Sequence, residues 1–226
     1  MKKFELTAEF VTNVFGKKLF RIKALVAFGD VEKGELGGFI EKEDNLSHDD
    51  NAWVYGNARV YGDAWVYGNA QVFGDARVSG NAQVFGDARV FGDARVSGNA
   101  WVSGNAQVFG DARVSGNAWV FDNARVYGDA WVYGNAQVSG NAQVSGNADY
   151  AAVAGFGRYF RTTTFFRCKD KILRVQCGCF YGDLAQFREI VKKTHGDSKY
   201  AKEYLAIADL MELHFAEEEE KQEAAE

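Results

Sequence analysis

A six-residue phrase, repeated 16 times between residues 51 and 146, constrains this chain more than any other feature. Its consensus is Asn/Asp-Ala-X-Val-Y-Gly, where X is Arg, Trp or Gln and Y is Tyr, Phe or Ser. Alanine and valine occur in every copy, and glycine closes every copy except the one that ends at Asp122. A period this strict predicts one structural unit per phrase and a repeat architecture.

The order of residues within the phrase predicts a short strand followed by a corner. Alanine and valine lie two positions apart, so in an extended chain they face the same side while X faces the other. Glycine followed by Asn or Asp favours a corner, because these residues tolerate positive φ. One alanine and one valine bury little surface alone, so we expect successive copies to stack on a narrow shared core. Strands of neighbouring coils then pair in parallel, about 4.8 Å apart.

The phrase resembles the hexapeptide-repeat family, which folds as a left-handed parallel β-helix with three hexapeptides in each triangular coil. The resemblance implies a mainly β chain with a single-stranded triangular solenoid of about six coils; the hand and the three faces come from the resemblance alone. The segment that precedes the repeats, 35–47, is also similar to bacterial and phage-borne members, whose functions are mostly unknown.

Residues 1–33 are expected to form an N-terminal β cap with a hairpin around Gly16, since open strand edges need covering. Residues 34–150 are assigned to the solenoid, with a decayed lead-in. Counting back from Val54 puts Ile40 and Leu46 at alanine positions and His48 at a valine position.

Residues 151–215 are expected to form a ββαα unit, and 216–226 an acidic, disordered tail. Residues 151–157 are interpreted as a linker or final turn, and 159–167 and 172–180 as strands. A helix is expected over 184–195 with Asp183 as its N-cap, and another over 198–215 with Asp197 as its cap.

Three repeats per turn would place every third X residue in one column. The first column is Trp53, Gln71, Arg89, Gln107, Arg125 and Gln143. The second is Arg59, Arg77, Arg95, Arg113 and Trp131, and the third is Trp65, Gln83, Trp101, Trp119 and Gln137. Another column, formed by the residues that precede glycine, contains Tyr55, Phe73, Phe91, Phe109 and Tyr127.

The arginine column has two interpretations. Several copies read Asp-Ala-Arg, which favours charge-paired, solvated ladders; recognition of an anion is the alternative. The aromatic columns are interpreted either as stacking ladders that stabilise the coils or as a docking surface. As candidate binding residues for a protein partner we take Trp65, Trp101, Trp119, Trp131, Arg59, Arg77, Arg95, Arg113, Phe73, Phe91 and Phe109.

Composition limits the partners and the cellular compartment that we expect for this chain. The formal net charge is −5, so no overall attraction to nucleic acid is expected. The sequence contains neither an 18-residue apolar stretch nor a signal-peptide core, so neither membrane insertion nor secretion is expected. Three cysteines, an odd number, argue against a disulfide framework and favour a reducing cytoplasm.

The sequence contains few candidate catalytic or metal-binding residues. Enzymes of the hexapeptide-repeat family are acyltransferases that use a histidine and a loop bulging from the coil between subunits of a trimer. Here the repeats contain no insertion, and the histidines are His48, His195 and His214, outside the regular repeats. Cys168, Cys177 and Cys179 are more readily explained as buried thiols than as a zinc site. No catalytic residue, metal site or cofactor is predicted.

These patterns favour a non-enzymatic, rigid scaffold or binding protein that presents aromatic and arginine columns to a protein partner or to another copy. A narrower hypothesis, from the resemblance, is a phage-borne inhibitor of a host enzyme or defence protein. The alternatives are a hexapeptide acyltransferase and a self-assembling structural rod.

Overall fold

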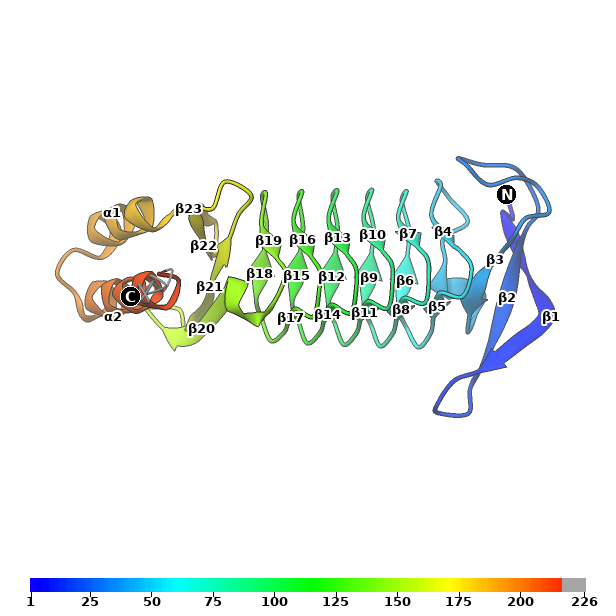
Figure 1. Ribbon diagram of the computed structural model, residues 1–226, viewed down its shortest axis with the longest axis horizontal. Coiled ribbons are helices and arrows are strands. Elements are labelled where there is room, and N and C mark those ends of the chain that lie inside the picture. Colours follow the sequence, from blue (N-terminus) through cyan, green and yellow to red (C-terminus); the bar gives the residue numbers. More distant parts are fainter. Residues whose placement is uncertain (217–226) are drawn as a thin grey trace, which may run out of the picture.

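The computed structural model describes residues 1–216, and residues 217–226, most of the predicted acidic tail, lie outside the described residues. Figure 1 shows an elongated solenoid whose coils lie side by side along the long axis. A strand-rich N-terminal region closes one end, and strands β20 to β23 with helices α1 and α2 close the other. Within residues 1–216, no helix is both long and apolar enough to span a membrane.

Each repeat contributes one two-residue strand formed by X and valine, as its alternation predicts. In chain order the strands are β4 (Trp53–Val54), β5 (Arg59–Val60), β6 (Trp65–Val66), β7 (Gln71–Val72), β8 (Arg77–Val78), β9 (Gln83–Val84), β10 (Arg89–Val90), β11 (Arg95–Val96), β12 (Trp101–Val102), β13 (Gln107–Val108), β14 (Arg113–Val114), β15 (Trp119–Val120), β16 (Arg125–Val126), β17 (Trp131–Val132), β18 (Gln137–Val138) and β19 (Gln143–Val144).

These strands form three parallel sheets, one for each predicted column. The first face is β4-β7-β10-β13-β16-β19, the second contains β5-β8-β11-β14-β17, and the third is β6-β9-β12-β15-β18. Arg95 stands between Arg77 and Arg113, and Trp101 between Gln83 and Trp119. The predicted three-strand coil and its columns are confirmed.

The core has the predicted composition. Every alanine and valine of the 16 repeats is at most 1% exposed, and together they form one continuous cluster. A residue with a polar side chain at either position would lose hydration without a partner inside so narrow an interior.

The N-terminal region is an antiparallel extension of the second face. Strands β1 (Phe4–Thr12), β2 (Lys18–Ala24) and β3 (Leu36–Ile40) pair in sequence, and β3 then pairs in parallel with β5. The predicted hairpin around Gly16 is therefore present. A short 3-10 helix, η1 (Glu43–Asn45), follows β3.

The register of the lead-in differs from the prediction. Ile40 pairs with Val60 and Leu46 with Val66, so both occupy valine positions rather than alanine positions. His48 consequently does not fill a valine position; its ring stacks on Phe4 with centroids 4.2 Å apart. The physical reason is two extra residues between Leu46 and Val54, since Val54 itself pairs with Val72 in the regular register.

The C-terminal unit has four antiparallel strands where the sequence analysis expected two. They are β20 (Tyr150–Phe156), β21 (Arg161–Arg167), β22 (Leu173–Cys177) and β23 (Phe180–Asp183), preceded by the 3-10 helix η2 (Asn147–Asp149). The segment interpreted as a linker or final turn is strand β20. It was missed because Ala-Ala-Val-Ala-Gly has no polar alternation to mark a strand.

Both predicted helices are present. Helix α1 (Leu184–His195) is capped by Asp183, which accepts a hydrogen bond from the Gln186 N–H at 2.8 Å. Helix α2 (Lys199–His214) is capped by Ser198 and not by Asp197, so that assignment was wrong by one residue. Together the helices cover a second core against the sheet, separate from that of the coils.

The corner glycines give a direct test of coil stacking. Gly98 has φ +69°, and a Cβ there would lie 2.9 Å from the Gly116 carbonyl oxygen of the next coil. Gly134 has nearly the same φ, +68°, but its Cβ would meet nothing within 4 Å. We predict that Gly134→Ala costs about 1–2 kcal/mol of unfolding free energy from backbone strain alone, and that Gly98→Ala costs more. Urea unfolding of the two variants tests this; equal losses would contradict close corner stacking.

Candidate functional site

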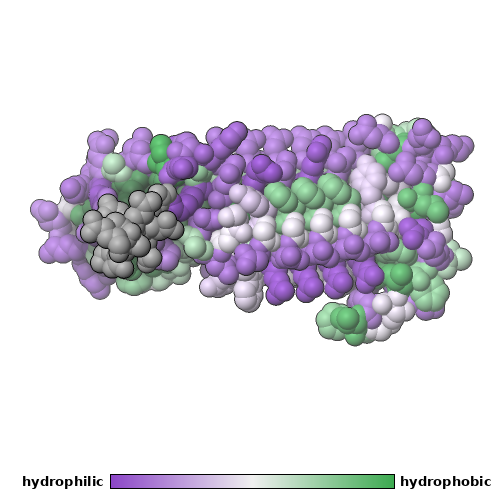
Figure 2. Space-filling model, in the orientation of Figure 1, coloured by the Kyte–Doolittle hydropathy of each residue, from purple (hydrophilic) through white to green (hydrophobic). Residues whose placement is uncertain are grey.

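The outer surface of the solenoid carries two aromatic ladders with different geometry. On one corner, Phe73, Phe91, Phe109 and Tyr127 stack face to face, with centroids 4.7, 4.8 and 5.1 Å apart and planes within 6°. The three phenylalanines are half-buried. An apolar row flanked by hydrophilic rows runs along the coils in Figure 2. This ladder uses its ring faces for contacts between coils, which is the stabilising role that the sequence analysis considered.

The second ladder, on the third face, is more exposed and less regular. Trp65 stacks on Tyr67 at 4.0 Å and Tyr67 on Phe85 at 4.8 Å. Phe85 meets Trp101 edge-on at 6.2 Å, and Trp101 meets Trp119 edge-on at 5.6 Å. We call Trp65, Tyr67, Phe85, Trp101, Trp119 and Phe121, which adjoins Trp119 at 4.6 Å, the aromatic strip.

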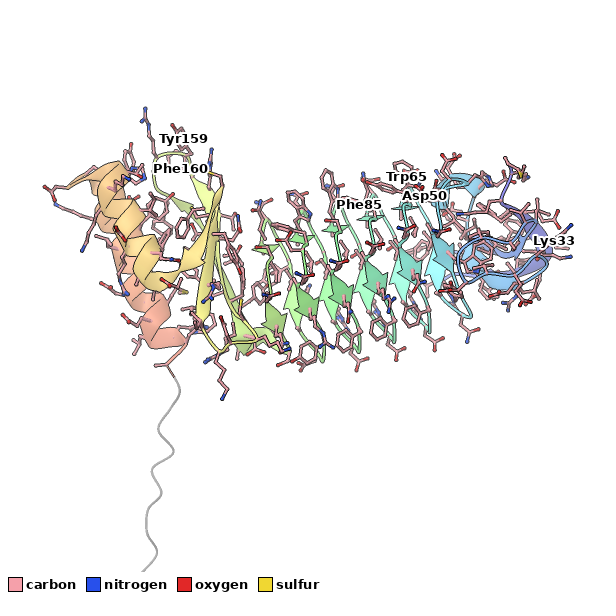
Figure 3. All side chains as sticks on the ribbon, turned by 90° about the horizontal axis from the view of Figure 1, so that it is seen from above. Lys33, Asp50, Trp65, Phe85, Tyr159 and Phe160 are labelled. Atoms are coloured by element: carbon pink, nitrogen blue, oxygen red, sulfur yellow. The ribbon has the colours of Figure 1, made fainter. Side chains whose placement is uncertain are left out.

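The aromatic strip leaves large apolar surface facing solvent. Trp65 is 42% and Trp101 40% exposed, whereas Trp119 is partly buried and donates its indole N–H to Ser103 Oγ at 3.2 Å. In Figure 3, Trp65 and Phe85 project from the same long edge of the molecule. Aromatic rings carry a negative face and a positive edge, so exposed rings set at different angles offer a partner both kinds of contact.

Trp53 is the exception among the outward tryptophans. It heads the first column, yet it is fully buried because the N-terminal region folds over it. Phe28 and Phe4 meet its ring edge-on at 5.3 and 6.2 Å. Its indole N–H has no hydrogen-bond partner in the described chain. Trp53 is therefore part of the packing between the N-terminal region and the first coil, and its ring offers no surface to a partner.

The second face carries the predicted arginine column, but without the predicted ion pairs. Within residues 1–216, no carboxylate oxygen lies within 4.0 Å of a guanidinium nitrogen of Arg59, Arg77, Arg95 or Arg113. The expectation of charge-paired Asp-Ala-Arg ladders is wrong for this arrangement, because each aspartate sits at the corner while its arginine lies at the centre of the face. Trp131, at the end of the column, is 47% exposed and donates its indole N–H to Ser115 Oγ at 3.1 Å.

The corners themselves are joined by amide ladders. Asn81, Asn99, Asn117 and Asn135 form one such ladder, in which each side-chain amide donates to the next at 2.9–3.0 Å. These side chains satisfy one another from coil to coil and are less available to a partner. Asparagine at the start of the phrase therefore has a structural role in addition to its tolerance of the corner.

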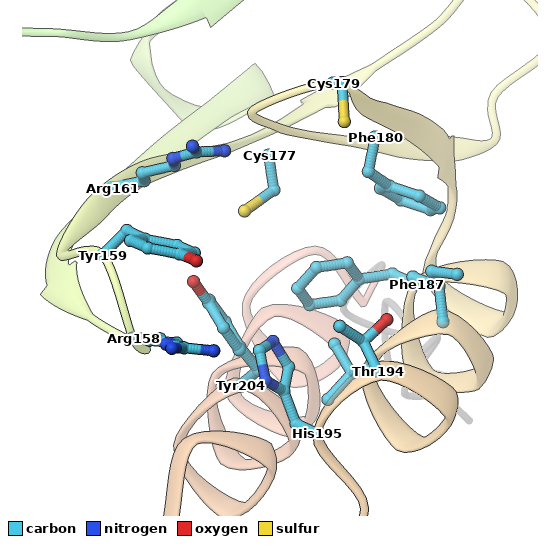
Figure 4. Close-up of a pocket in the computed structure, with 12 residues that line it drawn as sticks. Arg158, Tyr159, Arg161, Cys177, Cys179, Phe180, Phe187, Thr194, His195 and Tyr204 are labelled. Carbon is cyan, nitrogen blue, oxygen red and sulfur yellow. The ribbon is translucent and has the colours of Figure 1, made fainter.

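Cys177, Cys179 and His195 line one cavity at the C-terminal end (Figure 4), whereas His48, His214 and Cys168 do not line it. His48 Nδ1 accepts the Lys3 N–H at 3.1 Å inside the N-terminal region, and His195 and His214 lie on the C-terminal helices. Cys168 is buried, and burial raises its thiol pKa, but Cys177 is half-buried and Cys179 is exposed. The prediction of three buried thiols is thus wrong for Cys179. In the described chain no three His, Cys, Asp or Glu side chains are placed to hold a metal ion.

Sequence reasoning missed a second exposed group at the C-terminal end. The turn Arg158-Tyr159-Phe160-Arg161 joins β20 to β21, and its aromatic side chains are 63% and 71% exposed. Tyr159 and Phe160 project to the same side as Trp65 and Phe85 in Figure 3. The signal was available, since two aromatics between two arginines is an interface composition. The sequence analysis placed Tyr159 and Phe160 in a strand over 159–167, whereas β21 begins at Arg161.

The fold and surface define a parallel β-solenoid of about six coils with dissimilar ends and no histidine inside its regular coils. A family model described as the YdcK Beta solenoid repeat matches residues 52–68, 70–86, 82–96, 88–104, 106–121 and 118–134. These matches lie within the coils and support a repeat β-solenoid. No curated protein matches the chain.

The face-to-face ladder should contribute to stability more than to binding. We predict that Phe91→Ser, which introduces the residue used at the same repeat position in Ser97, lowers the unfolding free energy by about 1–3 kcal/mol through loss of two ring contacts. Ser97→Ala serves as the control, with an expected change within about 0.5 kcal/mol. Urea unfolding measures both; a loss for Phe91→Ser no larger than that of the control would remove the stabilising role.

Proposed function

We propose that this protein is a non-enzymatic, rigid binding protein whose third face docks a protein partner through the aromatic strip. The observation that carries the proposal is a run of tryptophan, tyrosine and phenylalanine rings along one face, with Trp65 and Trp101 about two-fifths exposed. Tryptophan and tyrosine are enriched among the residues that dominate binding energy in protein interfaces.

The position of this face in the molecule supports the proposal. The first face begins under the N-terminal region at Trp53, and the second continues into strands β1 to β3. The third sheet contains only solenoid strands, β6 to β18. Its aromatic strip is accordingly left open over most of its length and offers an area that does not depend on the ends.

Rigidity is the second support. Backbone hydrogen bonds join each coil to the next, for example from Trp101 N–H to Ala118 O and from Ser103 N–H to Val120 O, both 2.9 Å. A surface held in this way loses little conformational freedom when it binds, which lowers the entropy cost of association.

The arginine column supplies a secondary contact on the neighbouring face. Four arginines in register with no carboxylate within 4.0 Å in residues 1–216 favour acidic groups on a partner. Exposed charges of this kind contribute to association rate and orientation more than to affinity. We therefore assign Arg59, Arg77, Arg95 and Arg113 a steering role, and Trp131 an extension of the contact at the C-terminal side.

The alternatives have less support from geometry. An acyltransferase of the hexapeptide type would use a coil histidine and a loop bulging from the coils, whereas His48, the histidine nearest the coils, stacks on Phe4. A rod that assembles end to end would need open terminal coils. Here β3 pairs with β5 at one end, and Gln137 N–H donates to Thr164 Oγ1 at 2.9 Å at the other. The narrower hypothesis of a phage-borne inhibitor rests on the family resemblance and shares the same docking surface.

The test replaces Trp65, Trp101 and Trp119 together with glutamine, the residue that the same column uses at Gln83 and Gln137. We predict retained folding by circular dichroism and an affinity for the captured partner that falls about 30-fold or more, as loss of one interface hot spot implies. The partner is first captured from a lysate with the wild-type chain, and affinities are then measured with purified components.

Two controls separate the possibilities. Gln71, Gln107 and Gln143, changed together to alanine, alter the first face and should leave binding unchanged. Sedimentation of the wild-type chain and of the tryptophan variant shows whether the partner is a second copy, in which case the variant alone becomes monomeric. Unchanged affinity and unchanged association state of the tryptophan variant would exclude the third face as the docking surface.

A further inference from the structure

The turn between β20 and β21 holds Phe160 in a strained backbone conformation. Phe160 has φ +52°, in the left-handed region that bulky side chains rarely adopt, and its ring is 71% exposed. Strand pairing of Phe156 with Arg161 holds the ends of the turn together. Backbone strain at a residue whose aromatic side chain faces solvent is typical of functional segments.

Beside this turn lies a cavity of about 220 Å³ with an apolar floor. Phe187, Val191 and Tyr204, from helices α1 and α2, form the buried part of its lining. Figure 4 shows Arg158, Tyr159 and Arg161 on one side of this cavity, opposite Phe187. We call the cavity together with the turn at 158–161 the C-terminal cup.

The C-terminal cup has a cationic mouth. The guanidinium carbons of Arg158 and Arg161 lie 5.5 and 5.0 Å from the centroid of the Tyr159 ring. No acidic residue lines the cavity, and in residues 1–216 no carboxylate oxygen lies within 4.0 Å of either guanidinium. Two unpaired guanidinium groups held over one ring form a ready site for a carboxylate.

In the described part of the chain no acidic side chain lines the cup, and the carboxylate of Glu203, next to Tyr204, accepts the Gly157 N–H at 2.9 Å and pairs with Lys199 at 3.4 Å. Burial raises the pKa of Tyr204 to about 12, with a further contribution from the neighbouring Cys177, so its hydroxyl is neutral at pH 7. Thr163 Oγ1 donates a hydrogen bond to Cys177 Sγ at 3.2 Å. Among the described residues, the interior therefore contains no acidic side chain and is mostly apolar beneath a positive rim.

The size of the cavity limits what it can hold. Sites for cofactors and drug-sized molecules are typically about 300–1,000 Å³, and this cavity is smaller. A single large side chain inserted from a partner surface fits its volume, as anchor residues do in interfaces. The rim then pairs with carboxylates next to that side chain.

We propose that the C-terminal cup binds a segment of a partner protein that presents one large apolar side chain flanked by acidic residues. This site is independent of the aromatic strip. The chain's own residues 217–226 contain six glutamates but no large apolar side chain, so their sequence matches only the acidic half of the requirement.

The test uses the full-length chain, labelled with ¹⁵N, and three short peptides followed by amide chemical shifts. The peptides are acetyl-Glu-Glu-Phe-Glu-Glu-amide, the same peptide with glutamine in place of every glutamate, and the same peptide with alanine in place of phenylalanine. We expect the first to shift the amides of the cup, and the other two to bind about tenfold more weakly or less.

The variant Arg158→Gln/Arg161→Gln removes the cationic rim and leaves the buried floor unchanged. It should weaken binding of the first peptide about tenfold or more. Arg95→Gln/Arg113→Gln, also exposed arginines without a carboxylate partner in residues 1–216, is the matched control and should bind like the wild type. Because neither variant touches the aromatic strip, the outcome is separate from that of the tryptophan experiment.

Three results would overturn the proposal. Equal binding of the glutamine peptide would remove the role of the rim, and equal binding of the alanine peptide would remove the role of the floor. If amides of residues 217–226 shift in the Arg158→Gln/Arg161→Gln variant without any peptide, the chain's own tail occupies the cup and the partner site fails.

Discussion

Coil-to-coil backbone hydrogen bonding across 18 residues is the constraint on which the rest of the structure depends. Arg95 N–H donates to Ala112 O, Ser97 N–H to Val114 O, and Asn99 N–H to Gly116 O, at 2.7–2.9 Å. This ladder fixes the register, so alanine and valine point inward in every coil and X points outward. It also explains glycine at the corner, where a Cβ would press on the corner backbone of the next coil. A shift of the strand register by one residue would point the alanines and valines toward solvent and would also move the glycines away from the corners.

The regular part of the fold was predictable because the phrase repeats without interruption. The inward residues and the corner glycines were assigned correctly from the phrase itself, whereas the three columns followed from the three repeats per coil that the family resemblance implies. The lead-in was not, since two extra residues before Val54 shift Ile40 and Leu46 by two positions, and no periodic signal marks an insertion in a decayed repeat. Strand β20 was not predicted for a similar reason, because a run of small apolar residues shows no alternation of polar and apolar side chains.

The candidate surfaces also include residues that the sequence predicted and residues that only the structure shows. The predicted columns correctly placed Trp65, Trp101 and the arginines on the outer surface. The burial of Trp53 was not predicted, because it depends on Phe4 and Phe28, which fold back from another segment. The C-terminal cup unites residues from two turns, three strands and two helices, and only tertiary packing brings them together. Local sequence therefore indicated where aromatic side chains face solvent but not where a cavity forms. The solenoid thus carries two different surfaces, the aromatic strip along its third face and the cationic cup at its C-terminal end. Tyr159 and Phe160, at the cup, project to the same side of the molecule as Trp65 in Figure 3.

The most direct test of the account is cross-linking between engineered cysteines, mapped by mass spectrometry so that the native cysteines are distinguished. Arg95 and Arg113 are paired on adjacent strands of one face, whereas Gln107 lies on another face beside Arg89 and Arg125. Adjacent strands lie about 4.8 Å apart, within the range of Cα separations that a disulfide spans. Arg95→Cys/Arg113→Cys should form an intramolecular disulfide readily, and Arg95→Cys/Gln107→Cys should not. Cross-linking of the second pair, or its absence in the first, would contradict three-faced stacked coils and every surface derived from them.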